Sequence, residues 1–452
     1  MTPGILTTCA SCAAPIPYTA PRCGRCHTRY CGTACQAQHW NEGGHSREIC
    51  KKIKRRGGAE KYHADTKYNE AVAVAVEACA GYVPAGATCY ICTEAVVRRT
   101  GEGLVWAYCA CGDRDGVDSG MTGIAHVSCL VRHAEVAGED EMLSYQDTWR
   151  LWDTCRLCGE RYHGEVQCAL GWACWRANLS RDPREHIRRS AMGTLAGHLS
   201  CNDRNEEALA IHFASLNTIQ YHNPQLLEGC PDISYELAQG CLSLQSNIAN
   251  TLSILGRHDE AIARHRMVIG ERDRMFSEGN LELVVRPDGS QIGGAERVEM
   301  AQTYVKERLL SMLNMCVTLI DRQPTSADTL HDAQSLLWDN MADALRILGP
   351  NHEGMLLWRA NYARSIYLDE NASDEDLCRA NDMADEAESI SRKAFSDDHP
   401  QTRMFEELGR DSDSESTVDD AGAPAPALGP EAGEAARTPH AIAALCGQPL
   451  QL

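Results

Sequence analysis

Closely spaced pairs of cysteine and histidine are the residues of this sequence best suited to chemistry. Seventeen of the 23 cysteines precede residue 175, so this chemistry is concentrated in one part of the chain. Residues 9–50 contain four pairs: Cys9 and Cys12, Cys23 and Cys26, Cys31 and Cys35, and His45 and Cys50. Thiolate and imidazole are ligands that zinc prefers, and eight of them complete two tetrahedral sites. The spacing therefore predicts two zinc ions in a segment too short to fold on an apolar core alone.

A second series of pairs follows, with much longer gaps between one pair and the next. Its pairs are Cys89 and Cys92, Cys109 and Cys111, His126 and Cys129, and Cys155 and Cys158. Eight ligands again predict two zinc ions, which makes about four in the chain. Long gaps between short pairs favour a cross-brace, in which the first and third pairs share one zinc and the second and fourth pairs share the other. His126 then binds zinc through one ring nitrogen, and its other nitrogen needs a hydrogen-bonding partner.

The residues around the first series resemble the MYND zinc finger. Tyr30 precedes Cys31, Gln36 follows Cys35, and Trp40 lies upstream of a histidine, as in that family. The resemblance implies that the pairs interleave. One zinc would be held by Cys9, Cys12, Cys31 and Cys35, and the other by Cys23, Cys26, His45 and Cys50.

The MYND resemblance also implies a binding function. Fingers of that family bind proline-containing peptides of partner proteins and are not catalysts. Gln36 and Trp40 are the expected peptide-facing residues, and the alternative for Trp40 is that it only shields the zinc. Four residues separate His45 from Cys50 where the family usually has three, so His39 competes as the histidine ligand.

The second series resembles the RING-CH variant of the RING finger over residues 87–163. The likeness rests on the order of four cysteines, one histidine and three cysteines, on the tight Cys109-x-Cys111 pair, on the start "CYIC" and on Trp152. Most members of that family are ubiquitin-protein ligases, which hold a ubiquitin-charged conjugating enzyme beside a substrate. Most also carry transmembrane helices, whereas no sufficiently long apolar run occurs in this sequence.

The RING-CH resemblance implies residues that contact a conjugating enzyme and none that form a covalent intermediate. Ile91, Leu151 and Trp152 are expected to form an apolar groove for that enzyme. Arg156 or Arg161 is the candidate for a polar contact with ubiquitin. The alternative for Ile91 and Trp152 is packing around the zinc loops.

From about residue 184 onward the sequence has helical periodicity, with Ala and Leu at the apolar positions. Similar segments begin at Thr194, Asn247, Asn314 and Asn361. Gly256 is expected to separate the two helices of a hairpin. The segments resemble kinesin-light-chain-type tetratricopeptide repeats (TPR), which implies a superhelix with a peptide-binding groove. A rigid spacer without a ligand is the alternative, and residues 278–299 are expected to form an inserted loop or small hairpin.

The predicted fold class is mainly α, with two small zinc-stapled modules followed by a TPR-like helical superhelix and a disordered acidic tail. The predicted segments are a MYND-type finger at 9–50, a helical linker at 51–86, a RING-CH-type finger at 87–163, helical repeats at 184–408 and the tail at 409–452. Because each finger has its own metal, we expect chelation to unfold residues 9–163 and to leave the later helices intact.

Charge and cysteine usage narrow the choice of partners and compartment. The net charge of -20 argues against nucleic acid as the main partner. The first residues lack the basic and apolar segments of a signal peptide, so the thiols are expected in a reducing compartment, the cytoplasm or the nucleus. The basic run KKIKRR at 51–56 is interpreted first as a solvated face, and a nuclear-targeting or acidic-partner site is the alternative.

These observations together predict a zinc-binding, soluble ubiquitin-protein ligase. Its RING-CH-type finger would recruit a ubiquitin-conjugating enzyme, while the MYND-type finger and the helical repeats would bind peptides of substrates or partners. No membrane contact is expected. The alternative function is a non-catalytic interaction scaffold in which the RING-like module is only structural.

Overall fold

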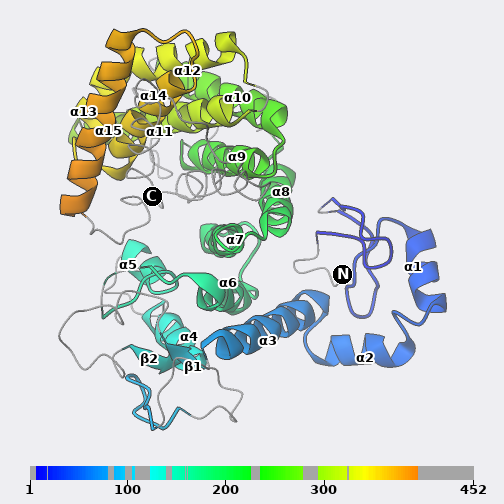
Figure 1. Ribbon diagram of the computed structural model, residues 1–452. Helices are drawn as coiled ribbons and strands as arrows, with labels where there is room; N and C mark the ends of the chain where they lie inside the picture. The colour runs from blue at the N-terminus through cyan, green and yellow to red at the C-terminus, as the bar shows by residue number, and fades with distance from the viewer. Residues whose placement is uncertain are drawn as a thin grey trace, which may run out of the picture. The chain divides into compact units, whose positions relative to one another are not determined.

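The computed structural model of the chain divides into two compact units (Figure 1). The first unit ends at Pro231 and the second begins at Asp232. The structure describes residues 7–17, 19–79, 86–96, 104–106, 123–138, 145–157, 159, 161–224, 235–277, 294–322 and 325–394. The tail predicted at 409–452 lies outside these residues. Within them, the predicted mainly α fold with cysteine clusters near the N-terminus is confirmed.

The first unit combines tight turns at its cysteine pairs with eight helices and one pair of short strands among its described residues. The helices are α1 (Thr33–Asn41), α2 (Arg47–Arg55), α3 (Ala59–Cys79), α4 (Val127–Ala137), α5 (Tyr145–Arg150), α6 (Gly164–Asn178), α7 (His186–Ser200) and α8 (Asn205–His222). The strands β1 (Leu104–Trp106) and β2 (Ile124–His126) pair antiparallel, with Leu104 opposite His126. This register fixes His126 at the end of a strand, directly before α4.

Helix α3 is a core element of the first unit and not only a linker. Its buried residues include Ala64, Tyr68, Ala71 and Ala75, whose spacing of three and four residues places them on one face. That face packs along α6, and Figure 1 shows the two helices side by side. The segment at 51–86 is helical over most of its length, as expected, but it belongs to the same core as its neighbours.

The core around α3 also contains residues of the second finger. One apolar cluster joins Ile124, Trp149 and Trp152 of the finger to α3 and to the buried faces of α6, α7 and α8. The fully buried side chains of Trp172 and Trp175 on α6 lie in the same cluster. Because the second finger and these helices share one core, we expect them to unfold together, in place of the independence expected from the sequence.

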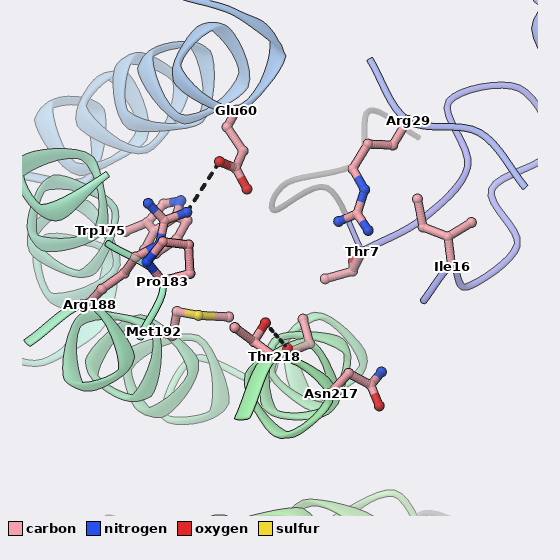
Figure 2. Close-up of a pocket in the computed structure, with 11 residues that line it drawn as sticks. Thr7, Ile16, Arg29, Glu60, Trp175, Pro183, Arg188, Met192, Asn217 and Thr218 are labelled. Carbon is pink, nitrogen blue, oxygen red and sulfur yellow. Dashed lines mark hydrogen bonds and ion pairs between the residues drawn. The ribbon is translucent and has the colours of Figure 1, made fainter. Parts of the chain in front are cut away.

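The segment of the first finger lies against these helices at a small cavity (Figure 2). Its lining includes Ile16 and Arg29 from the finger and Trp175, Arg188 and Met192 from the helices. Glu60 of α3 pairs with Arg188 of α7 at 3.2 Å. The volume of about 40 Å³ holds a few water molecules and no larger ligand, so this is a gap in the packing.

The hairpins α7–α8 and α9 (Tyr235–Ile254) with α10 (His258–Ser277) have the same turn at equivalent positions. Gly256, between α9 and α10, has a φ of 75°, and Asp203, between α7 and α8, has a φ of 57°. In each turn a backbone N–H donates to a carbonyl five residues earlier, the bond of a Schellman motif. The bonds are Arg204 N to Leu199 O and Arg257 N to Leu252 O, both 2.9 Å. The segments from Thr194 and Asn247 are thus matching helical hairpins.

The second unit is a series of helices in which each packs on a neighbour in the chain. After α9 and α10 follow α11 (Gly294–Asp321), α12 (Ala327–Asp339), α13 (Met341–Leu348), α14 (Glu353–Tyr367) and α15 (Asp374–Ala394). The segments from Asn314 and Asn361 lie in α11 and α14, which pack on α12 and α15. Residues 278–293 of the expected insertion lie outside the described residues, and the remainder is helical because it begins α11.

A charged pair is buried inside the second unit. The guanidinium of Arg272 on α10 is fully enclosed and lies 3.3 Å from a carboxylate oxygen of Glu307 on α11. It also donates to Gln239 of α9 at 3.2 Å. Burial raises the pKa of the Glu307 carboxyl, and the charge of Arg272 opposes that rise. The pair therefore joins three successive helices.

Within the described residues, no helix combines the length and the apolar character that a membrane span requires.

Candidate metal centres

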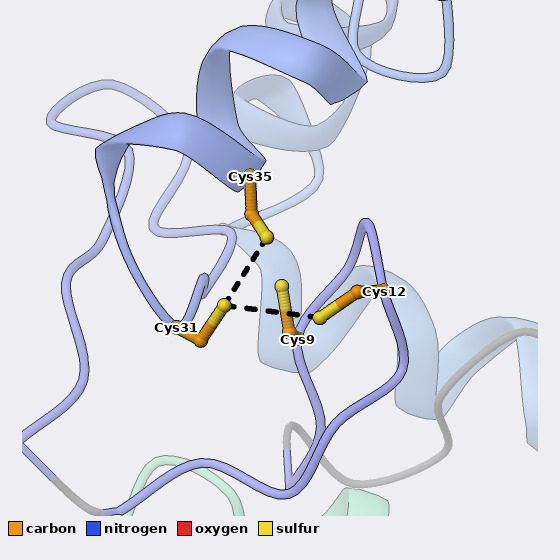
Figure 3. A group of neighbouring side chains, drawn as sticks. All are labelled: Cys9, Cys12, Cys31 and Cys35. Carbon is orange, nitrogen blue, oxygen red and sulfur yellow. Dashed lines mark hydrogen bonds between the residues drawn. The ribbon is translucent and has the colours of Figure 1, made fainter.

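The first centre consists of Cys9, Cys12, Cys31 and Cys35, whose sulfur atoms lie within 4.8 Å of one another (Figure 3). The Sγ of Cys31 lies 3.7 Å from that of Cys12 and 3.2 Å from that of Cys35. Two sulfurs bound to one tetrahedral zinc at about 2.3 Å would be about 3.8 Å apart. Cys12 and Cys31 are exposed and Cys35 is half-buried, so this centre is open to solvent.

The second centre consists of Cys23, Cys26, His45 and Cys50, and all four side chains are buried. The Sγ atoms of Cys23 and Cys50 are 3.9 Å apart. The Nε2 of His45 lies 3.1 Å from the Sγ of Cys26, so this nitrogen faces the cluster. Cys50 lies in α2, whose N-terminus is capped by the hydroxyl of Ser46. The same short helix therefore fixes the last ligand.

Tyr30 holds the histidine of the second centre in place. Its hydroxyl lies 2.8 Å from Nδ1 of His45 and 3.1 Å from Nδ1 of His39. With Nε2 of His45 turned to the metal, its Nδ1–H donates to Tyr30, whose own O–H then donates to His39. His39 belongs to none of the ligand groups among the described residues, whereas His45 belongs to the second group.

The third centre consists of Cys89, Cys92, His126 and Cys129, the first and third pairs of the second series. The Nδ1 of His126 lies 3.4 Å from the Sγ of Cys92 and 3.7 Å from that of Cys129. His126 thus faces its cluster through Nδ1, whereas His45 uses Nε2. The tight junction between β2 and α4 explains this, because His126 and Cys129 are only one helical turn apart.

All three centres begin with the same backbone knuckle. The residue after the second cysteine of each knuckle has a positive φ: 59° for Ala13, 63° for His27 and 62° for Thr93. Its N–H donates to the carbonyl of the first cysteine, at 2.9, 2.9 and 2.8 Å. Left-handed backbone is rare for residues other than glycine, so the knuckle is held against a local preference. Sequence reasoning did not identify these residues, although their fixed distance from each first cysteine is a usable signal.

The last pair of the second series also begins with this knuckle. Gly159 has a φ of 78°, and its N–H donates to the carbonyl of Cys155 at 2.9 Å. Cys155 itself is buried. Its expected partners lie outside the described residues; these are Cys109, Cys111 and Cys158. The described part of the fourth predicted centre therefore has the backbone shape of the other three.

The electrostatics of the thiols fit a divalent cation. Burial opposes ionisation of Cys9 and Cys89, but backbone N–H groups of their knuckles, together with those of Cys31 and His126 respectively, lower the pKa to about 6 and about 7. Burial and the neighbouring thiolates raise the pKa of Cys50 and of Cys129, because several negative charges cannot share one site. Zinc removes that repulsion and binds four thiolate or imidazole ligands without carboxylates. Zinc is thus the cofactor of these centres, and the three described groups have places for three of the four predicted ions.

The three residues predicted to contact a conjugating enzyme differ in their exposure to solvent. Ile91 is 36% exposed, and Leu151 is half-buried. Trp152 is only 4% exposed and belongs to the core shared with α6, which favours the alternative that it packs inside the finger. Arg161 pairs with Asp153 at 3.1 Å.

Sequence reasoning missed an exposed apolar residue at a knuckle of the second finger. Leu157 is 43% exposed and occupies the same place in its knuckle as Ile91 does. The corresponding residues of the first finger are Ser11 and Arg25. Arg156, beside Leu157, lies with its Nη1 2.7 Å from Nε2 of His133. The knuckles of the two fingers therefore have surfaces of different chemistry.

Comparison with models of known protein families, with curated protein sequences and with solved structures finds no match to this chain.

The first centre should release its metal before the second. Three of its four thiolates are solvent-accessible, whereas the second centre is buried and its histidine is fixed by Tyr30. Loss of the hydrogen-bonding partner of a ligand histidine typically weakens metal affinity by about 10- to 100-fold. Zinc release to a chromophoric chelator should therefore include a fast phase from the first centre, in which Cys12 and Cys31 become open to alkylation. Alkylation of Cys26 in that phase would contradict the expected order of release. Tyr30→Phe should speed release from the second centre and bring the two release rates closer together.

Proposed function

We propose that this protein is a zinc-dependent ubiquitin-protein ligase of the RING-CH type, with a MYND-type finger and TPR-like helices for binding partner peptides. The observation that carries the proposal is the third centre, in which the first and third ligand pairs share a site across a long intervening segment. A cross-brace requires this pairing. The knuckle at Cys155 supports a second site made by the remaining pairs.

The surface of the second finger supports a role in binding another protein. Ile91 and Leu157 each place an exposed aliphatic side chain at the tip of a metal-held knuckle. Exposed apolar residues on a rigid turn lose little conformational entropy on binding, so they suit an interface. Trp152 and Trp149 lie beneath, in the core, where they support the finger without touching a partner.

A ligase of this kind performs no covalent chemistry with its own side chains. Zinc supplies a structural cross-link that holds the knuckles in place. The residues of the chain bind the conjugating enzyme and orient its thioester-linked ubiquitin toward a substrate amine. Acceleration then arises from positioning, which converts a bimolecular encounter into a reaction within one complex.

The first finger and the helical repeats would supply the substrate or partner contacts. Trp40 is 48% exposed, and its ring also lies edge-on to His45 at 5.7 Å. It can therefore cover the second centre with one edge and offer the other to a proline-containing peptide. Gln36 is half-buried on the same helix, α1. The helices of the second unit are proposed to bind a further peptide.

The compartment that suits this function keeps thiols reduced. The thiols of the three described groups must stay reduced in order to bind zinc. We therefore place the protein in the cytoplasm or the nucleus.

Substitution of Ile91 tests the ligase directly. Ile91→Ala leaves every metal ligand in place and removes an apolar contact, which at an interface contributes on the order of 1 to 3 kcal/mol. Binding of a ubiquitin-charged conjugating enzyme should fall about 5- to 150-fold. The measurement is ubiquitin discharge from a panel of conjugating enzymes, with zinc content measured in parallel. Leu157→Ala should also weaken binding of the charged conjugating enzyme.

Val74→Ala is the matched control, because Val74 is an exposed aliphatic residue of α3. It should discharge ubiquitin at the rate of the unmodified protein. If the unmodified protein stimulates none of the enzymes, the non-catalytic scaffold replaces the ligase. If Ile91→Ala matches the unmodified protein, ligase activity stands and the contact surface lies elsewhere.

A further inference from the structure

Helix α2 and the residue after it carry a cluster of exposed cations. Its buried residues are Cys50 and Ile53, so the rest of its surface faces solvent. Five exposed cations follow Cys50: Lys51, Lys52, Lys54, Arg55 and Arg56. None of the five forms an ion pair within the described part of the chain, although acidic residues outnumber basic ones by 63 to 43 in the whole sequence. Unpaired positive charge on so acidic a protein suggests an external anionic partner.

Two of these cations open onto a trough along α3. Its lining includes Arg55, Arg56, Lys61, Asp65, Asn69 and Arg176. Lys61, Asp65 and Asn69 are spaced four residues apart and therefore form one stripe of the helix. From the α2–α3 turn to Asn69 the trough follows about 12 residues, roughly 18 Å at 1.5 Å per residue. That length accommodates about five or six residues of an extended peptide.

The charges along the trough alternate. Arg55, Arg56 and Lys61 line the trough near the α2–α3 turn, and Arg176 of α6 lines it beside Tyr68, the neighbour of Asn69. Arg176 is held in place by its guanidinium, 3.9 Å from the ring centroid of Tyr68. Between the ends lies the carboxylate of Asp65, 3.6 Å from the Lys61 ammonium. A ligand must therefore carry negative charge at both ends and avoid it near the centre.

We propose that this trough binds an extended acidic peptide of a partner protein, with acidic side chains at its two ends and neutral residues between them. Asn69 contributes an exposed side-chain amide, which can donate to and accept from a peptide backbone. A nucleic-acid strand fits less well, because its charges are spaced evenly and one phosphate would lie against Asp65. The binding does not depend on ligase activity.

The same geometry argues against the nuclear-targeting interpretation of residues 51–56. The basic run is helical from Lys51 to Arg55 and is anchored by the metal ligand Cys50 and by the buried Ile53. An extended, freely accessible basic peptide is therefore not present in the folded protein. Its cations instead form one surface with those of α3 and α6.

The test uses the full-length zinc-loaded protein and a fluorescein-labelled peptide, Glu-Glu-Asn-Ser-Gly-Glu, followed by fluorescence anisotropy. Arg55→Ala/Arg56→Ala should weaken binding about 10-fold, equivalent to about 1.4 kcal/mol. Lys51→Ala/Lys54→Ala removes the same charge from α2 outside the trough and should change binding less than about 3-fold. Zinc content should be unchanged in both variants, because every substituted side chain is exposed.

Asp65→Asn provides a second, opposite test. The unmodified protein should bind the peptide Glu-Glu-Glu-Glu-Gly-Glu, with charge at its centre, more weakly than the first peptide, and Asp65→Asn should remove that preference. Equal losses in the two double variants would show non-specific attraction and overturn the proposal. Tighter binding of a thymidine hexanucleotide than of either peptide, or no binding of the first peptide, would overturn it as well.

Discussion

Removal of zinc will unfold the helices of the first unit together with its fingers and leave the helices of the second unit folded. Zinc contributes about 10 to 16 kcal/mol to small structural sites, which is comparable to the whole stability of a typical domain. The third centre positions Ile124 at one edge of the core that includes α3, α6, α7 and α8. Loss of this centre removes the covering of that core, so the effect extends to the helices.

Hydrogen exchange with mass spectrometry, with and without a strong chelator, measures this effect. Protection should be lost in α3 and α6–α8 and retained in α9–α15. His126→Gln should reproduce the loss in the first unit, and His331→Gln, which changes an exposed histidine of α12, is the matched control. Protected α6–α8 in the presence of chelator would mean that the finger and the helices fold independently after all.

Arg272→Ala should destabilise the second unit by about 3 to 5 kcal/mol. The substitution leaves the carboxylate of Glu307 largely enclosed without its cation, and it removes the bond to Gln239. Urea denaturation followed by helical circular dichroism, on protein whose first unit has been unfolded by chelator, measures the change. The loss of unfolding free energy caused by Arg272→Ala should become smaller as the pH falls. Burial raises the pKa of Glu307, and protonation neutralises the isolated carboxylate.

The double variant Arg272→Met/Glu307→Leu separates the loss of a partner from the value of the pair. Replacing a buried ion pair by apolar residues of similar volume is often neutral or stabilising. The double variant should therefore be at least about 2 kcal/mol more stable than Arg272→Ala. If both variants are equally unstable, then the pair is required for the geometry of the helices, and its charge is not the main source of the effect.

The metal centres could be predicted from the sequence because zinc ligation is largely a matter of residue type and spacing. The pairs that begin at Cys9, Cys23 and Cys89 each need only a local turn to bring two sulfurs together. The hairpin turn at Gly256 could be predicted for the same reason, since a left-handed residue is a local requirement. Asp203 gives a weaker signal at the equivalent position because glycine is the usual residue there.

The remaining features depend on contacts between segments that are distant in the sequence. From its sequence, the alanine-rich α3 resembles a linker. Only its packing on α6 shows that one of its faces is buried. Trp152 stands beside a zinc ligand pair, so its sequence position indicates the finger and not the core that it enters. The burial of Arg272 arises from the packing of three helices, and no local pattern around it distinguishes a buried arginine from an exposed one.

The packing of α3 on α6 has a consequence for synthesis on the ribosome. The third centre has all its ligands once Cys129 has been made, but the apolar surface around it is not covered until α8 has followed, with Ile211 among the last core residues. At about 5 to 20 residues per second, this delay is on the order of ten seconds. During that time the nascent chain carries a complete third centre beside an exposed apolar surface. Chaperone engagement of this intermediate would therefore be timed by the appearance of α6 to α8 and not by the arrival of zinc.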